Sequence, residues 1–289
     1  MIQSMTGFGK HVLSLPRKKI NVEIRSLNSK NLDLNARIPH QYKEKELELR
    51  KMVGQSLVRG KIDFSVYVES THEETSSQVN IPVVEEYVRQ LKEVSIHTQK
   101  ENDIEYLKMA VRMPDTLKTE REEIDETEYK SIQDAVTEAL QNITAFRKAE
   151  GAHLKEDFEL RISHITDLLE RVITIDPERT QAVRERLRKG VEELKEKIDE
   201  NRFEQELVYY IEKYDITEEK VRLKNHLNYF TETLNTADSN GKKLGFISQE
   251  IGREINTIGS KANYAPMQQL VVQMKDELEK IKEQLLNVL

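Results

Sequence analysis

The 289-residue sequence contains no cysteine and no tryptophan, and it has only six prolines and ten glycines. Without cysteine there can be no disulfide, no thiolate metal site and no cysteine nucleophile, so any metal must be bound by His, Asp or Glu. This composition fits the reducing cytoplasm, where we expect the protein to work. The scarcity of proline and glycine, with 34% charged residues, argues against a loop-rich all-β protein and predicts mostly helix.

Long hydrophobic runs are also missing. No eighteen consecutive apolar residues occur, so we expect no membrane-spanning helix. The first ten residues do not show a basic segment followed by an apolar one, so we expect no signal peptide. The sequence also lacks a P-loop, a GxGxxG motif after a strand and a GxSxG elbow, which argues against nucleotide hydrolysis and serine-hydrolase chemistry.

The net charge of −7 hides an uneven distribution along the chain. Residues 1–70 hold 13 Lys and Arg against 7 Asp and Glu, whereas residues 71–289 hold 32 against 45. A second basic segment, residues 220–263, holds seven Lys and Arg against four acids. A polyanion such as RNA could bind both basic segments, although charge differences of this size also occur on surfaces that are only solvated.

Strands are predicted in the first seventy residues, where apolar and polar positions alternate over residues 20–25, 32–38 and 62–68. The segment 28–31, Asn-Ser-Lys-Asn, has turn chemistry, so the first two strands should form an antiparallel hairpin. A helix is expected over residues 39–58, before the third strand.

Helical periodicity begins near Pro82 and continues to the end of the chain. We expect a long helical hairpin over residues 150–214, broken at Asp176-Pro177. One stripe of its second arm consists of Val183, Leu187, Val191, Leu194 and Ile198. Two helices should flank a loop at residues 236–241, and another should begin near Pro266.

The expected fold class is therefore α+β, with a small antiparallel sheet domain followed by a mostly helical region. We divide the chain into an amino-terminal α+β domain at residues 1–150, a helical hairpin arm at 151–214 and a carboxy-terminal helical domain at 215–289.

A candidate site lies on the two helices that flank the loop. Glu250, Glu254, Thr257 and Lys261 are spaced four, three and four residues apart and share one helix face. Arg222, His226, Tyr229 and Thr233 follow the same spacing on the preceding helix. If the helices fold back antiparallel about residues 238–239, position 226 lies opposite position 251, and His226 meets Glu250 and Glu254.

One imidazole and two carboxylates could bind Mg²⁺ or Mn²⁺, which prefer oxygen ligands and accept nitrogen. The same residues also have an ordinary structural interpretation. A Glu pair at this spacing is commonly a solvated helix face, and a single His near a helix interface is commonly just packed.

Several segments resemble the YicC/YloC family of endoribonucleases. They are Ser4-Met5-Thr6-Gly7-Phe8-Gly9-Lys10, VEIRSLNSKNLDLNARIP from Val22 to Pro39, RLKNHLNYF from Arg222, and GKKLGFISQEIGREINTIGSKAN from Gly241. The last segment departs from the family pattern at Gly245, where Asp is frequent, and at Gly252, where Asn is frequent. Any role of those two side chains is therefore not transferred to this sequence.

The resemblance implies a homo-hexameric, divalent-cation-dependent endoribonuclease, with other RNA-degrading enzymes as candidate partners. On this basis His226, Glu250 and Glu254 are the candidate metal ligands and catalytic residues. The candidates for binding RNA are Arg25, Lys30, Arg37, Arg222, Arg253 and Lys261. Two other functions stay open: a non-catalytic RNA-binding adaptor that presents transcripts to nucleases, and a structural oligomer that scaffolds other proteins.

Overall fold

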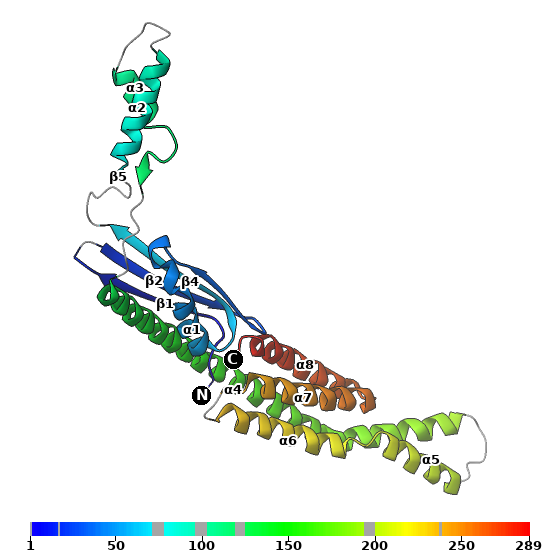
Figure 1. Cartoon of the computed structure of the whole chain (residues 1–289). Coiled ribbons are helices and arrows are strands. Elements are labelled where there is room, and N and C mark those ends of the chain that lie inside the picture. Colours follow the sequence, from blue (N-terminus) through cyan, green and yellow to red (C-terminus); the bar gives the residue numbers. More distant parts are fainter. Residues whose placement is uncertain are drawn as a thin grey trace.

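The main sheet has four strands in the order β1-β2-β4-β3 (Figure 1). Its strands are β1 (Gly7–Ser14), β2 (Lys18–Leu27), β3 (Leu32–Arg37) and β4 (Gly60–Ser70). β1 and β4 each pair antiparallel with β2, and β3 pairs parallel with β4. This computed structural model describes residues 2–16, 18–70, 78–95, 103–118, 125–193, 200–236 and 239–289.

The predicted strands are present, but the predicted hairpin between β2 and β3 is wrong. β4 lies between them, because Val22 and Ile24 of β2 match the buried Val66 and Phe64 of β4 in register. β3 is only partly buried, which suits an edge position. The helix that follows it, η1 (His40–Lys45) with α1 (Glu46–Leu57), provides the crossover that a parallel pair requires.

A small lobe projects from the sheet (Figure 1). It consists of α2 (Ile81–Ser95), α3 (Asp103–Ala110) and the two-stranded pair of β5 (Gln78–Val79) with β6 (Leu117–Lys118). None of the helices in the described part of the chain is both long and apolar enough to cross a membrane.

The helix α4 (Glu126–Glu193) runs through Pro177, so the predicted break at Asp176-Pro177 is wrong. Proline removes one helical hydrogen bond, but contacts of Asp176 hold the helix at this point. Its carboxylate binds Arg179 Nε at 2.8 Å and Lys220 Nζ at 2.6 Å. The second arm is α5 (Glu200–Lys213), and Leu194 and Ile198 of the predicted stripe lie outside the described residues.

A carboxy-terminal bundle forms from α6 (Thr217–Leu234), α7 (Gly241–Lys261) and α8 (Ala265–Leu285) on the second half of α4. The hydrophobic core of this bundle includes Ile2, because the first residues of the chain pack against it. Ser4 N donates to Arg147 O, and Leu289 N donates to Gln3 O, so the two chain ends lie side by side (Figure 1). α4 is continuous across the domain boundary predicted at residue 150, and the division into three domains stays a prediction.

Candidate active site

The helices α6 and α7 lie antiparallel, and contacts at both ends bracket their register. Far from the turn, Lys261 Nζ lies 2.8 Å from Glu219 Oε1 and donates to the Asp215 carbonyl at 2.9 Å. Near the turn, Lys243 Nζ lies 4.7 Å from the centre of the Tyr229 ring. In the register of the first contact, position 226 of α6 lies opposite position 254 of α7. In the register of the second contact, it lies opposite position 246.

His226 therefore faces the stretch of α7 that carries Glu250 and Glu254. The three side chains differ in burial: His226 is half-buried and Glu250 is exposed, whereas Glu254 is only 4% exposed. Although all three are described residues, no hydrogen bond or ion pair links His226 to either carboxylate. Glu254 makes no such contact with any described residue at all.

The Glu254 side chain is only 4% exposed, but its carboxylate oxygens are not among the fully buried polar atoms that lack a partner, so water still reaches the carboxylate. Within the described residues, however, no group of three or more His, Asp and Glu side chains is placed to hold a metal ion. His226, Glu250 and Glu254 thus do not form a preassembled three-ligand site in one chain. Fewer donors still fit Mg²⁺, which commonly uses one or two carboxylates and keeps several waters.

The three predicted cations of this region have different surroundings. Lys261 forms an ion pair with Glu219, and this pair joins α7 to α6. Arg222 pairs with Glu218 one turn away on its own helix. Arg253 has the freest side chain, 74% exposed, with its nearest carboxylate on Glu250 at 3.9 Å.

A hydrogen-bonded turn fixes the start of α6 beside Lys261. The Thr217 hydroxyl donates to Asp215 Oδ1 at 2.8 Å, and the Thr217 backbone N–H donates to the same oxygen at 3.2 Å. The hydroxyl contact, supported by the nearby lysines 220 and 261, holds the pKa of Asp215 below its ordinary value. This carboxylate stays charged near neutral pH and keeps Lys261 at the helix end.

The basic candidates of the amino-terminal region lie on the sheet and its edge, and all three are exposed. Arg25 pairs with Glu23 at 3.4 Å and lies 5.5 Å from the centre of the Phe8 ring. Arg37 shares the face of Arg25, since Arg25 is paired with Asp63 and Arg37 with Ser65, two positions on one face of β4. Lys30 lies in the connection between β2 and β3, away from this row.

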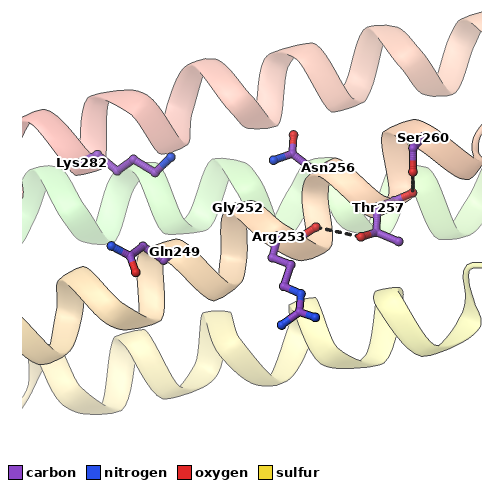
Figure 2. A pocket seen from close by; sticks show the side chains of 7 residues that line it. All are labelled: Gln249, Gly252, Arg253, Asn256, Thr257, Ser260 and Lys282. Carbon is purple, nitrogen blue, oxygen red and sulfur yellow. Dashed lines mark hydrogen bonds between the residues drawn. The ribbon is translucent and has the colours of Figure 1, made fainter.

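Sequence reasoning missed a polar groove next to the predicted face of α7, between α7 and α8 (Figure 2). Its α7 residues Gln249, Arg253, Asn256 and Ser260 are spaced four, three and four residues apart, as in the predicted face. That spacing was a usable signal. Because these residues are neutral except Arg253, however, the spacing alone does not indicate a binding site. Lys282, on the other wall of the groove, is distant in sequence.

Comparison with known proteins covers both halves of the chain. The family described as endoribonuclease YicC-like, N-terminal region, matches residues 2–156, and its C-terminal counterpart matches residues 172–289. The chain belongs to the YicC-like endoribonuclease family. The resemblance inferred from the sequence segments is thereby confirmed, and the whole α6–α7 pair falls in the C-terminal match.

Two curated relatives align over their full lengths and over the whole of this chain. One, from Clostridioides difficile (strain 630), is 33% identical, and the other, from Haemophilus influenzae (strain ATCC 51907 / DSM 11121 / KW20 / Rd), is 29% identical. Both are named probable endoribonuclease YicC. The names of the family and of these relatives indicate an endoribonuclease.

Proposed function

We propose that this chain is an endoribonuclease that hydrolyses phosphodiester bonds in RNA at the α6–α7 pair, with a divalent cation as cofactor. The observation that carries the proposal is the Glu254 carboxylate, which lacks a partner among the described residues, remains accessible to water and lies on the stretch of α7 facing His226. Family membership supplies the substrate class, because both matching relatives are named as probable endoribonucleases.

Each residue has a separate task in this reaction. Glu254 and Glu250 supply negative charge that would hold Mg²⁺ or Mn²⁺, directly or through water. When bound, such a cation polarises a phosphate or lowers the pKa of a water molecule. The half-buried His226 can accept or donate a proton at a ring nitrogen, and the exposed Arg253 guanidinium can bind a phosphate in a two-pronged manner.

The decisive experiment is cleavage of a labelled structured RNA by the purified protein, with EDTA and with Mg²⁺ or Mn²⁺ added back. We expect Glu254→Gln and Glu250→Gln each to lose most of the metal-dependent cleavage, because the shape is kept and the charge is lost. His226→Ala should behave in the same way. Glu232→Gln, an exposed carboxylate of α6, is the matched control and should cleave like the unchanged protein.

The competing function is the RNA-binding adaptor, which the lack of a three-ligand group in the described residues favours. It predicts RNA binding that survives EDTA, with no cleavage under any cation. Full cleavage by both Gln variants would remove the reaction from this helix pair. Unfolding of either variant at temperatures where the control is folded would identify the carboxylates as structural.

We also propose that the chain assembles with copies of itself, as a hexamer in line with the resemblance. The projecting lobe of α2 and α3 carries several large apolar side chains in contact with water, and clusters of such residues often mark a surface that binds another protein. Its exposed apolar residues include Ile81, Val94, Leu107 and Met109. Light scattering at micromolar concentration should give a mass well above 33.8 kDa, and a monomer would contradict the proposal.

A further inference from the structure

The polar groove between α7 and α8 has a volume of about 560 Å³ and is lined mostly by residues of α7, with Lys282 of α8 on its other side (Figure 2). Seven residues line it: Gln249, Gly252, Arg253, Asn256, Thr257, Ser260 and Lys282. Pockets for drug-sized ligands commonly have volumes of about 300–1,000 Å³, and this groove offers a comparable volume while staying broadly open to solvent. The groove is thus large enough for a nucleotide.

The charge of the lining favours an anion. It contains two cations, Arg253 and Lys282, and no carboxylate. Lys282 Nζ lies 2.7 Å from Glu279, whose side chain is 64% exposed, and Arg253 lies 3.9 Å from Glu250. Exposed ion pairs of this kind contribute little, so a phosphate can replace either carboxylate as the partner of these cations.

Neutral donors and acceptors lie between the two cations. The side-chain amides of Gln249 and Asn256 make no hydrogen bond with any described residue. The hydroxyls of Thr257 and Ser260 donate to the carbonyls of Arg253 and Thr257, at 3.0 and 2.9 Å, so each hydroxyl oxygen keeps its lone pairs as an acceptor (Figure 2). Amides that can both donate and accept are suited to the edges of unpaired bases.

Gly252 keeps the floor of the groove open. A Cβ atom at this position would lie 3.2 Å from Leu278 Cδ2 and 3.7 Å from Lys282 Nζ. A side chain here would therefore occupy the space between α7 and the lysine. Gly252 is also one of the two positions at which the sequence departs from the YicC/YloC pattern, so the depth of the groove is partly a property of this chain.

We propose that the groove binds a single-stranded segment of RNA next to the cleavage site, with Arg253 and Lys282 on phosphates and Gln249 and Asn256 on base edges. The proposal rests on the proposed function, since RNA is its substrate. Glu250 and Glu254 follow Gln249 and Arg253 by one residue, so they occupy the adjacent face of α7. An RNA strand that crosses α7 from the groove would bring a phosphodiester to the face that carries Glu250 and Glu254.

The test measures binding of a short labelled single-stranded RNA in EDTA, so that affinity is separated from cleavage. The double variant Arg253→Gln with Lys282→Gln should bind about tenfold more weakly at low salt. For this variant, the slope of log K against the logarithm of salt concentration should be less steep by about 1.4, because each phosphate contact on a single strand contributes about 0.7 to the slope. The matched control, Lys130→Gln with Lys148→Gln, removes two exposed charges of α4 and should leave both values unchanged.

The amides give an independent readout. Gln249→Ala with Asn256→Ala should change the relative affinity for RNAs of different base composition and leave the salt dependence unaltered. If the charge variant binds RNA like its control in both affinity and salt dependence, the groove is not an RNA site. That result, with normal cleavage by the unchanged protein, would overturn the groove alone. A protein that never cleaves but shows the predicted losses in EDTA would overturn the proposed reaction alone.

Discussion

The two halves of α4 support two different kinds of packing. Against the sheet, the helix presents small residues such as Ala135 and Ala139, and Gly7 and Gly9 of β1 let the two backbones approach closely. Against the bundle, it presents large side chains, such as Phe158, whose ring packs edge-on against Phe230 at 6.0 Å. The contact with the sheet therefore depends on small side chains that let the backbones approach, whereas the contact with the bundle depends on large side chains that interdigitate.

Both halves of α4 also make ion pairs. On the bundle side, Asp176 pairs with Lys220 of α6 and Arg161 with Glu277 of α8, and on the sheet side Glu128 pairs with Lys18. Tyr129 also donates to Glu48 at 2.6 Å on the sheet side, and burial together with this hydrogen bond raises the pKa of Tyr129 to about 12. We infer that the bundle contact responds to acid through Glu277, whose pKa is lowered, while the sheet contact responds more strongly to added side-chain volume.

The largest expected effect comes from adding one methyl group where the backbones meet. In Gly9→Ala, the new Cβ would lie 2.2 Å from the Ala139 carbonyl and 2.8 Å from the Ile143 nitrogen, so helix and strand must separate. We expect the free energy of unfolding to fall by about 3 kcal/mol, at the upper end for overpacked sites. Urea unfolding at fixed protein concentration measures the change.

Gly245→Ala is the matched control in the bundle, because its Cβ would meet no heavy atom within 4 Å. Alanine is favoured over glycine inside a helix, so this variant should be more stable by about 0.5–1 kcal/mol. Equal effects of the two substitutions would show that backbone proximity does not distinguish the two halves of α4.

The same contrast explains which elements could be predicted from sequence. The α6–α7 pair was predicted correctly because two adjacent helices with a short loop have few alternatives to folding back on each other. The pairing of β2 with β4 is non-local, and the local turn chemistry of residues 28–31 pointed to the wrong partner. There, Asn28 Nδ2 instead donates to the Leu286 carbonyl at 2.5 Å. Because these two residues are far apart in sequence, a local sequence pattern could not predict this contact.

Pro177 and the candidate site show the same limit. A proline predicts a break from its own chemistry, but the ion pair of Asp176 with Lys220 joins residues far apart in sequence. Spacing likewise identified Glu250 and Glu254 as residues on one face of α7. It could not show that Glu254 is buried and Glu250 exposed, because burial depends on how α6 and α8 flank the helix.

A smaller expected effect than that of Gly9→Ala tests the acid response of the bundle through Glu277, which joins α8 to α4. Its carboxylate accepts hydrogen bonds from Lys280 at 2.6 Å and Arg161 at 3.1 Å, and lies 3.4 Å from His164 Nδ1. Partial burial alone would raise its pKa, but these contacts hold the pKa of Glu277 below its ordinary value. Glu277→Gln should therefore lower the free energy of unfolding at pH 7 by about 1 kcal/mol.

The pH dependence gives this last comparison its sign. A carboxyl whose pKa is lower in the folded state stabilises the fold fully above its unfolded pKa, about 4.3 for Glu, and loses that contribution as pH falls through the folded value. The difference between Glu277→Gln and the unchanged protein should be constant from about pH 7 to 5 and shrink below about pH 4. Glu283→Gln, an exposed carboxylate of the same helix, should show no such trend in urea unfolding at each pH. A Glu277→Gln difference that stays constant down to acid pH would mean that these contacts do not make the bundle side of α4 acid-sensitive.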